Sequence, residues 1–313
     1  MDQAHCETVY RFLRSLQDRL CRDFESEDGA GKFLRDHWER APEAGKLAGL
    51  GTTAVLELGA VFERAGVALS DVNGATMPAA ATARNPQLAG RAFRAMGVSV
   101  VMHPLNPNVP SSHLNVRYFQ AGDIWWFGGG FDLTPYLIFE EDVFLWHRAA
   151  ASVCEPFHER LYSLLRANCD EYFFMRHRGE ARGVGGLFYD DLNEATPEIG
   201  MSWELCFDFM QSVASGYLEA YLAILRQRRN AAYGERERQY QLYRRGRYVE
   251  FNLLQDRGTL FGLQSGGRAD AILISMPPTV HWSYRSPDKE LDARLLPYLT
   301  TLRGRDWIAP GRS

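Results

Sequence analysis

Three strands in succession constrain the fold of this chain more than any other feature of its sequence. Residues 97–102 (GVSVVM) form a buried apolar run, residues 114–119 (LNVRYF) alternate in polarity, and residues 124–127 (IWWF) follow a Gly-Asp turn. The connection over residues 103–113 contains three prolines, so it is a rigid loop and neither a helix nor a central strand. Consecutive strands joined by such connections favour an antiparallel sheet.

Helical segments are expected on both sides of these strands. Apolar side chains recur at a helical spacing over residues 7–25, and long helical segments are predicted over 139–178 and 201–230. A last helix is expected over residues 288–302. The chain therefore begins with a helix and returns to helices after its first group of strands.

Two further strands are predicted near the C-terminus, over residues 248–254 (YVEFNLL) and 259–263 (TLFGL), joined by a Gln-Asp-Arg-Gly hairpin signal. The order of helix, strands, helices and strands favours an α+β fold over alternating βαβ units. No repeat and no linker-like segment divides the sequence, so residues 1–313 are expected to form a single domain.

The composition excludes several classes of protein. No run of 18 apolar residues occurs and no signal-like N-terminus is present, so a cytoplasmic protein without a membrane span is expected. The formal net charge of -4 argues against a nucleic-acid partner. Five scattered cysteines without a CxxC pair favour neither a disulfide framework nor a thiolate metal site. Nearly all the cationic residues are Arg, the side chain that binds carboxylates in a bidentate manner, although genome composition explains this more simply.

Four histidines lie near the conspicuous segments. His103 and His113 flank the proline-containing loop and could point into one cleft, whereas His147 and His177 lie on the helical segment that follows. Four histidines could bind a divalent metal. No pair has the spacing that places two ligands on one helical turn, so the pattern favours hydrogen-bonded structural histidines over a metal site.

The motif WWFGGGFDLTPY (125–136) combines three glycines with a single acidic residue. The glycines remove side chains where the backbone turns or approaches a ligand, and Asp132 follows in an aromatic and aliphatic setting. A carboxylate in such a setting is unfavourable unless it is paired. Asp132 either caps a turn near Thr134-Pro135 or acts as a buried acceptor facing a cationic or N–H-bearing substrate, and the sequence supports both interpretations equally.

Three other motifs have weaker implications. The sequence SGGR (265–268) places backbone N–H groups beside a guanidinium, which suits a carboxylate or a phosphate but is also typical of a surface turn. The glycine cluster over 182–192 is no dinucleotide fingerprint, and its Asp190-Asp191 pair is more typical of a solvated strand end than of a metal site. Residues 235–247 interleave Arg with Tyr, which favours ion pairs on a helix or a subunit contact over RNA binding.

Taken together, these segments resemble one family, the oxygen-dependent coproporphyrinogen III oxidases of haem biosynthesis. The stretches that carry the resemblance are 96–119, 125–136, 177–193, 233–268 and 274–282, which together cover most of residues 90–285. The resemblance implies a large, mostly antiparallel sheet flanked by helices on both faces. It also implies a homodimer, with residues 248–283 as the dimer-forming segment.

The resemblance further implies the reaction. The ring A and ring B propionates of coproporphyrinogen III are oxidatively decarboxylated to vinyl groups, which gives protoporphyrinogen IX. Dioxygen is the acceptor, carbon dioxide and hydrogen peroxide leave, and no organic cofactor is needed.

The roles of individual residues also follow from the resemblance. His113 takes the role of proton donor, and Asp132 falls on a carboxylate that faces the pyrrole N–H groups. The positions that correspond to substrate contacts are Ser99, Asn115, Val116, Arg117, Arg182, Gly266, Gly267 and Arg268. The positions that correspond to ligands of a divalent metal are His103, His113, His147 and His177; the spacing leaves open whether a metal is required.

This chemistry agrees with the residue types. Arginines recognise the four carboxylates of the substrate, and an aromatic-lined cleft suits its flat pyrrole rings. We expect a desolvated Asp132 to hold or remove a pyrrole proton, which enriches the ring in electrons and promotes its reaction with oxygen. The variant Asp132→Ala is then expected to lose most of its turnover while remaining folded.

The sequence departs from the family pattern over residues 49–66. Thr52, Thr53 and Ala54 stand where the family carries a glycine-rich stretch with Arg, and Leu58 stands near a usual Asp. Two other functions remain open: a metal-dependent oxygenase or lyase with histidine ligands, and a non-catalytic tetrapyrrole-binding protein.

Overall fold

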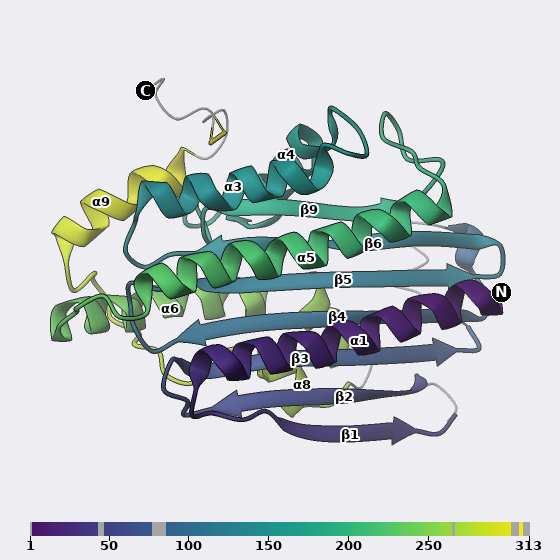
Figure 1. The fold of residues 1–313 in the computed structure, drawn as a ribbon, viewed down its shortest axis with the longest axis horizontal. Helices are drawn as coiled ribbons and strands as arrows, with labels where there is room; N and C mark the ends of the chain where they lie inside the picture. Colours follow the sequence, from purple (N-terminus) through teal and green to yellow (C-terminus); the bar gives the residue numbers. More distant parts are fainter. Residues whose placement is uncertain (1, 43–46, 77–85, 265–266, 302–306, 309–313) are drawn as a thin grey trace.

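A seven-stranded antiparallel sheet forms the centre of the computed structural model (Figure 1), which describes residues 2–42, 47–76, 86–264, 267–301 and 307–308. The strand order is β1-β2-β3-β4-β5-β6-β9, so the first six strands form a meander and β9 joins later beside β6. The strands are β1 (Leu34–Arg40), β2 (Ala48–Glu57), β3 (Phe62–Gly74), β4 (Phe93–Pro104), β5 (Ser111–Ala121), β6 (Ile124–Thr134) and β9 (Gly185–Leu192).

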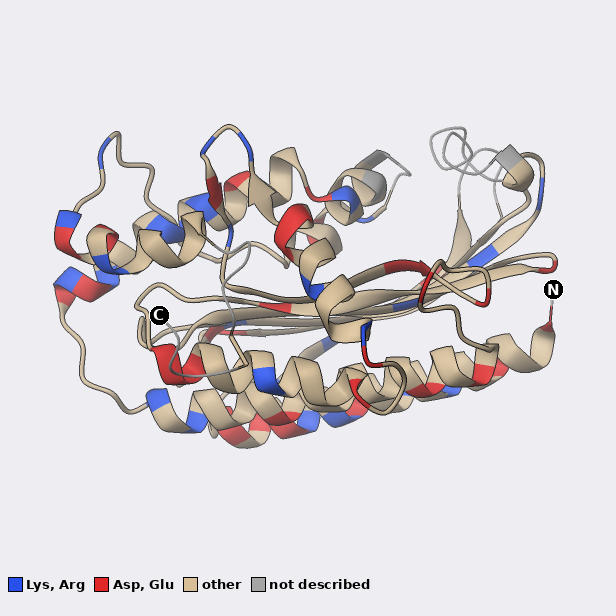
Figure 2. Cartoon of the chain, turned by 90° about the horizontal axis from the view of Figure 1, so that it is seen from above, with Lys and Arg blue, Asp and Glu red and all other residues tan. Residues whose placement is uncertain are grey.

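Helices cover both faces of this sheet (Figures 1 and 2). On one face lie α1 (Gln3–Asp28), α5 (Trp203–Arg228) and α3 (Glu140–Cys154), with α4 (Leu161–Tyr172) beside β9. The other face is covered by α6 (Glu235–Leu254), α7 (Arg257–Gln264) and α8 (Ala269–Leu273). The remaining elements are η1 (Pro86–Leu88), the pair β7 (Phe174–Met175) and β8 (Glu180–Ala181), and α9 (Lys289–Thr300). The predicted α+β fold, with its antiparallel sheet flanked by helices, is confirmed.

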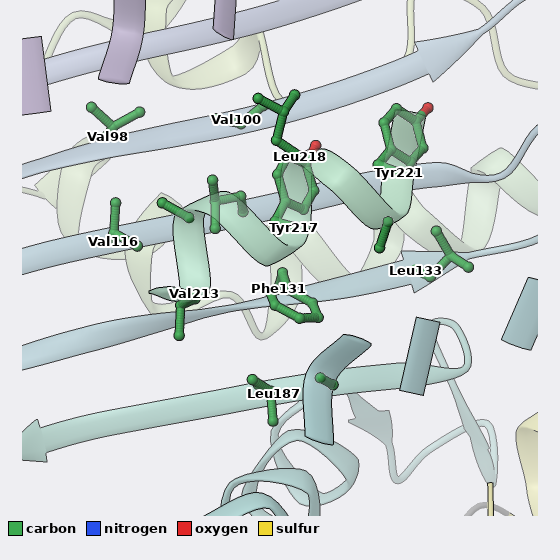
Figure 3. Packing of buried hydrophobic residues seen from close by; sticks show 14 of the residues in the cluster. Val98, Val100, Val116, Phe131, Leu133, Leu187, Val213, Tyr217, Leu218 and Tyr221 are labelled. Carbon is green, nitrogen blue, oxygen red and sulfur yellow. The ribbon is translucent and has the colours of Figure 1, made fainter. Parts of the chain in front are cut away.

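The main hydrophobic core lies between the sheet and α5 (Figure 3). Because side chains alternate along a strand, Val98, Val100 and Val116 point to this face, and they meet Val213 and Tyr217 of α5. The residues between them on the strands point to the opposite face, under α6–α8. Each central strand therefore has one face that packs in the core and a second face, under α6–α8, that does not take part in this core.

Most of the predicted elements are present. The strands expected over 97–102, 114–119 and 124–127 lie in β4, β5 and β6. The helices expected over 7–25, 201–230 and 288–302 correspond to α1, α5 and α9. The segment over 139–178 was expected to be helical throughout, but it divides into α3 and α4 and ends in the β7–β8 turn that carries His177.

The two predicted C-terminal strands are wrong, because residues 248–254 end helix α6 and residues 259–263 lie in α7. The β-branched and aromatic side chains of 248–254 favour a strand locally. In the structure, Tyr240, Tyr248 and Phe251 are buried at spacings of a helix, and the buried Arg245 donates to Glu63 and to the backbone oxygen of Pro104. Tertiary packing and these long-range contacts therefore extend the helix through the segment.

His147 is part of the packed interior of α3. Its Nδ1 lies 3.1 Å from the Tyr162 hydroxyl and its Nε2 lies 2.9 Å from the backbone oxygen of Val184, which is an acceptor only. Nε2 therefore carries the hydrogen, and a neutral ring satisfies both contacts. Burial lowers the pKa of His147 from 6.5 to about 3, with Arg166 adding to the decrease and the bond to Val184 opposing it.

The burial of His147 predicts a dependence of stability on pH. Between pH 6.5 and about 3 the unfolded chain binds a proton at this site and the folded chain does not, so the free energy of unfolding decreases as the pH falls. The contribution is about 1.4 kcal/mol per pH unit. We measure the free energy of unfolding by denaturant at pH 7 and at pH 5. Between these two pH values His147→Gln should lose about 2 kcal/mol less of this free energy than the unmodified protein. Parallel losses in the two proteins would contradict this assignment.

Candidate active site

A cavity of about 370 Å³ lies between the sheet and the layer formed by α6–α8. The sheet contributes its floor, and Asn252 of α6, Thr259 of α7 and Ile272 of α8 contribute to the opposite wall. Tyr172 and Phe188 line one part of the wall, and Trp38 of β1 lines another. The size and the mixture of apolar and polar walls are typical of a small-molecule site.

The floor of the cavity is a row of side chains that crosses six strands. The strand register pairs Thr53 with Ala68, Ala68 with Ser99, Ser99 with Asn115, Asn115 with Gly130, and Gly130 with Phe188. Every member of this row lines the cavity. Because its central members are small, the sheet presents a platform on which a flat ring system can lie.

The neighbouring row places an acidic residue beside a histidine. Asp132 of β6 pairs in register with His113 of β5, and the His113 Nδ1 lies 3.1 Å from the Asp132 Oδ1. The Asp132 side chain is 2% exposed and does not line the cavity, whereas His113 does. His113 therefore stands between the carboxylate and the space that a ligand would occupy.

Arg182 neutralises the Asp132 carboxylate. Its Nη2 donates to both carboxylate oxygens, at 2.8 and 2.7 Å, and its Nη1 donates to Asn252 Oδ1 at 2.6 Å. The guanidinium is stacked among the rings of Phe173 and Tyr248, 4.3 and 4.5 Å from their centroids. This aromatic enclosure fixes the position of the charge and keeps water away from it.

The pair is ionised despite its burial. Burial alone would raise the pKa of Asp132, but Arg182 and the contact with His113 hold this pKa below its ordinary value. Burial alone would lower the pKa of Arg182, and Asp132 raises it above the ordinary value. An ionised Asp132 can only accept hydrogen bonds, so the His113 Nδ1 carries the hydrogen and Nε2 is left to interact with a bound molecule.

Two further arginines line the cavity at different places. Arg117 of β5 lies across Gly128, where a Cβ atom would come within 2.7 Å of its Nε. Arg268 precedes α8 and pairs with Asp36 of β1. Strands β1 and β5 are four strand spacings apart, or about 19 Å, so the cavity has cationic groups at two well-separated places.

Most of the predicted substrate-contact residues line the cavity. Those that line the cavity are Ser99, His113, Asn115, Arg117, Arg182, Gly267 and Arg268. The Val116 side chain points into the core beside α5, because side chains alternate along a strand (Figure 3), and a substrate contact through its backbone stays a prediction. Gly266 lies outside the described residues.

The four histidines proposed as metal ligands do not come together. His103 is buried, with Nδ1 bonded to Ser111 and Nε2 to the backbone oxygen of Ser275, and both ring nitrogens of His147 are engaged in α3. His177 lies in the exposed β7–β8 turn against Glu250. Within the described ranges, no three His, Cys, Asp or Glu side chains are arranged around a common metal position. The described residues do not fit the predicted histidine metal site.

Sequence reasoning missed several residues of the cavity. Trp38 of β1, Thr53 of β2 and Ala68 of β3 lie in a region for which no strands were predicted. Within the unusual stretch 49–58, Thr53 faces the cavity, whereas Ala54 is buried and Leu58 is 89% exposed in the turn before β3. The alternation of residues 66–70 was the signal that could have revealed this part of the floor.

A comparison with protein families adds the deciding observation. The family described as coproporphyrinogen III oxidase matches residues 8–307 of the 313. The chain belongs to the coproporphyrinogen III oxidase family. Membership in this family makes the protein an oxidoreductase of porphyrin biosynthesis that acts on a porphyrinogen. Among the described residues, no helix has the length and apolar character needed to cross a membrane.

The buried pair predicts a large effect of removing the Asp132 carboxylate. In Asp132→Ala the guanidinium of Arg182 stays buried without its partner, so the free energy of unfolding should fall by about 3–5 kcal/mol in urea denaturation. The expectation that the variant remains folded is therefore joined by the expectation that it is much less stable. The control Asp36→Ala, which removes a carboxylate from the exposed pair with Arg268, should lose much less. Equal losses in the two variants would contradict the account of the pair.

Proposed function

We propose that this protein catalyses the oxygen-dependent conversion of coproporphyrinogen III to protoporphyrinogen IX. At each of two propionates, the –CH2–CH2–COOH arm and one O2 become a vinyl group, CO2 and H2O2. The observation that supports this proposal is a small-residue platform with the Asp132–His113 pair in the neighbouring row and arginines at two separate places along the cavity. Family membership independently supports a porphyrinogen substrate.

In this proposal the macrocycle lies over the platform. The row from Ala68 through Ser99 and Asn115 to Gly130 has no large side chain that would lift the rings away from the sheet. Arg117 and Arg268 bind carboxylate arms that extend to opposite sides, through charge-assisted hydrogen bonds. Arg182 does not bind an arm through both of its terminal nitrogens, because these already donate to Asp132 and Asn252.

His113 is the proposed catalytic residue. Its Nε2 accepts a proton from a pyrrole N–H, and the imidazolium that results is stabilised by Asp132 behind it. Loss of the pyrrole proton enriches the ring in electrons and promotes its oxidation by dioxygen. His113 then returns the proton, which agrees with the proton-donor role implied by the resemblance. Asp132, expected to face the pyrrole N–H groups directly, acts through His113 in this revised form.

The electrons pass from the substrate to dioxygen, so the proposal requires no organic cofactor. Cytoplasmic location and a homodimer formed around residues 248–283 remain predictions from the sequence and the resemblance. The metal-dependent alternative is disfavoured by the separation of its four histidines in the fold. The non-catalytic alternative retains the cavity but produces no vinyl groups.

The decisive experiment incubates purified, chelator-treated protein with coproporphyrinogen III in the presence and absence of oxygen. We expect protoporphyrinogen IX only with oxygen, with one CO2 and one H2O2 released for each vinyl group formed. Oxygen-independent turnover, or activity that is lost on chelation and restored by a metal, would contradict the proposal. Binding without any vinyl product would identify a carrier instead.

The role of His113 predicts a defect in turnover more than in binding. His113→Asn should lower kcat by about 100-fold or more while KM changes much less, because the arginines that bind the carboxylates are unchanged. Its melting temperature should stay close to that of the unmodified protein, since the side chain is partly exposed to the cavity. A kcat within threefold of the unmodified value would eliminate His113 as the catalytic residue.

A further inference from the structure

Asp190, at the end of β9, joins two arginines that belong to different layers of the molecule. The Nη2 of Arg117, on β5, donates to its Oδ1 at 2.8 Å, and the Nη2 of Arg257, at the start of α7, lies 3.3 Å from its Oδ2. The carboxylate therefore lies between the sheet that forms the floor of the cavity and the helical layer that covers it. The Asp190 side chain is 24% exposed.

The contacts of Arg117 fix the direction of its guanidinium. Nη2 is bonded to Asp190, Nη1 lies 3.4 Å from the Asn115 Oδ1, and Nε rests over the bare backbone of Gly128. Burial would lower the pKa of Arg117, but Asp190 keeps it above the ordinary value, so the cation persists. The side chain is 37% exposed and lines the cavity, which leaves it able to contact a ligand.

Arg257 is held outside the cavity. Its guanidinium lies over the rings of Tyr172 and Phe188, 4.9 and 5.6 Å from their centroids, and its backbone N–H donates to the Tyr172 hydroxyl. The two rings stack on each other at 4.3 Å, and both line the cavity. Arg257 therefore contacts Asp190 from outside the cavity, whereas Arg117 contacts Asp190 and also lines the cavity.

The Asp190 carboxylate limits the positive charge at this side of the cavity. It is shared by the guanidinium groups of Arg117 and Arg257. A second carboxylate, that of Asp256, accepts from the Tyr172 hydroxyl and lines the cavity here. Without Asp190, the surroundings of Arg117 would become more positive by one charge.

We propose that Asp190 is a positioning and specificity-determining residue, which orients Arg117 and limits the attraction of this side of the cavity for a carboxylate arm. It acts through Arg117 and does not touch the ligand. The limited attraction allows the arm to leave after turnover, because excess attraction would bind substrate and product alike. This inference rests on the proposed function, from which the carboxylate-bearing ligand is taken.

The test uses the variants Asp190→Asn and Asp190→Ala with fluorescent coproporphyrin III, the oxidised and stable form of the proposed substrate, as the probe. Asp190→Asn keeps an oxygen that accepts from Arg117 but removes the negative charge. We expect its Kd to be about 3- to 10-fold lower than that of the unmodified protein, with a steeper loss of affinity as salt is added. Asp190→Ala also releases Arg117, so we expect it to bind more weakly than Asp190→Asn.

The neighbouring Asp191 supplies a matched control. Asp191→Asn removes the same charge from the next residue, and Asn tolerates the left-handed backbone at this position (φ 56°). We expect its Kd to change by less than twofold. The uncharged tetramethyl ester of the probe should not distinguish Asp190→Asn from the unmodified protein.

An unchanged or higher Kd in Asp190→Asn would overturn the limiting role of the charge. Equal Kd values for Asp190→Asn and Asp190→Ala would overturn the orienting role. Turnover of coproporphyrinogen III by the unmodified protein is measured separately, so failure of the proposed reaction is distinguished from failure of this inference. If the unmodified protein binds the probe but shows no turnover, and Asp190→Asn binds the probe more tightly, the inference about Asp190 holds and the proposed reaction is wrong.

Discussion

The buried ion pair between Asp132 and Arg182 is the interaction on which the rest of the site depends. Both side chains are 2% exposed, and each would be strongly unfavourable there without the other. The pair fixes the ionised state of Asp132, which in turn fixes the hydrogen on the His113 Nδ1. It also ties the segment before β9 to β6 and, through Asn252, to α6, so the floor and the cover of the cavity meet at this point.

The antiparallel register aligns the alternating side chains of neighbouring strands, so the two faces of the sheet have different roles. The side chains on one face of each central strand pack against α5. Those on the other face form rows of small side chains and polar groups across the sheet. A one-residue shift between β5 and β6 would remove Asp132 from His113 and place apolar side chains on the platform. The large core on the α5 side stabilises this register, and the register places the cavity-lining residues beside one another on the opposite face.

The central part of this arrangement was predictable because alternation is a local property. The alternation of residues 114–119 puts Asn115 and Arg117 on one face of β5, and both line the cavity. The sequence also indicated that a carboxylate in the setting of Asp132 needs a partner, and the structure gives it Arg182. The identity of its partner was not predictable, because Arg182 is fifty residues away and the contact depends on how β9 returns to the sheet. The strand-like residues 248–254 were misassigned because burial and distant ion pairs, which their local preferences do not encode, keep them helical. Thr53 was missed because its neighbours Thr52 and Ala54 are small and carry little periodic signal, whereas the alternation around Ala68 was present but was not used.

The most direct test of the central claim is a crystal structure of the protein with a tetracarboxylate porphyrin bound. The account predicts that the macrocycle lies over Ser99, Asn115 and Gly130, with a ring nitrogen within hydrogen-bond distance of the His113 Nε2 and carboxylates at Arg117 and Arg268. Asp132 should keep its bonds to Arg182 in the complex. A macrocycle bound elsewhere, or one that contacts Asp132 directly after Arg182 has moved away, would contradict the account.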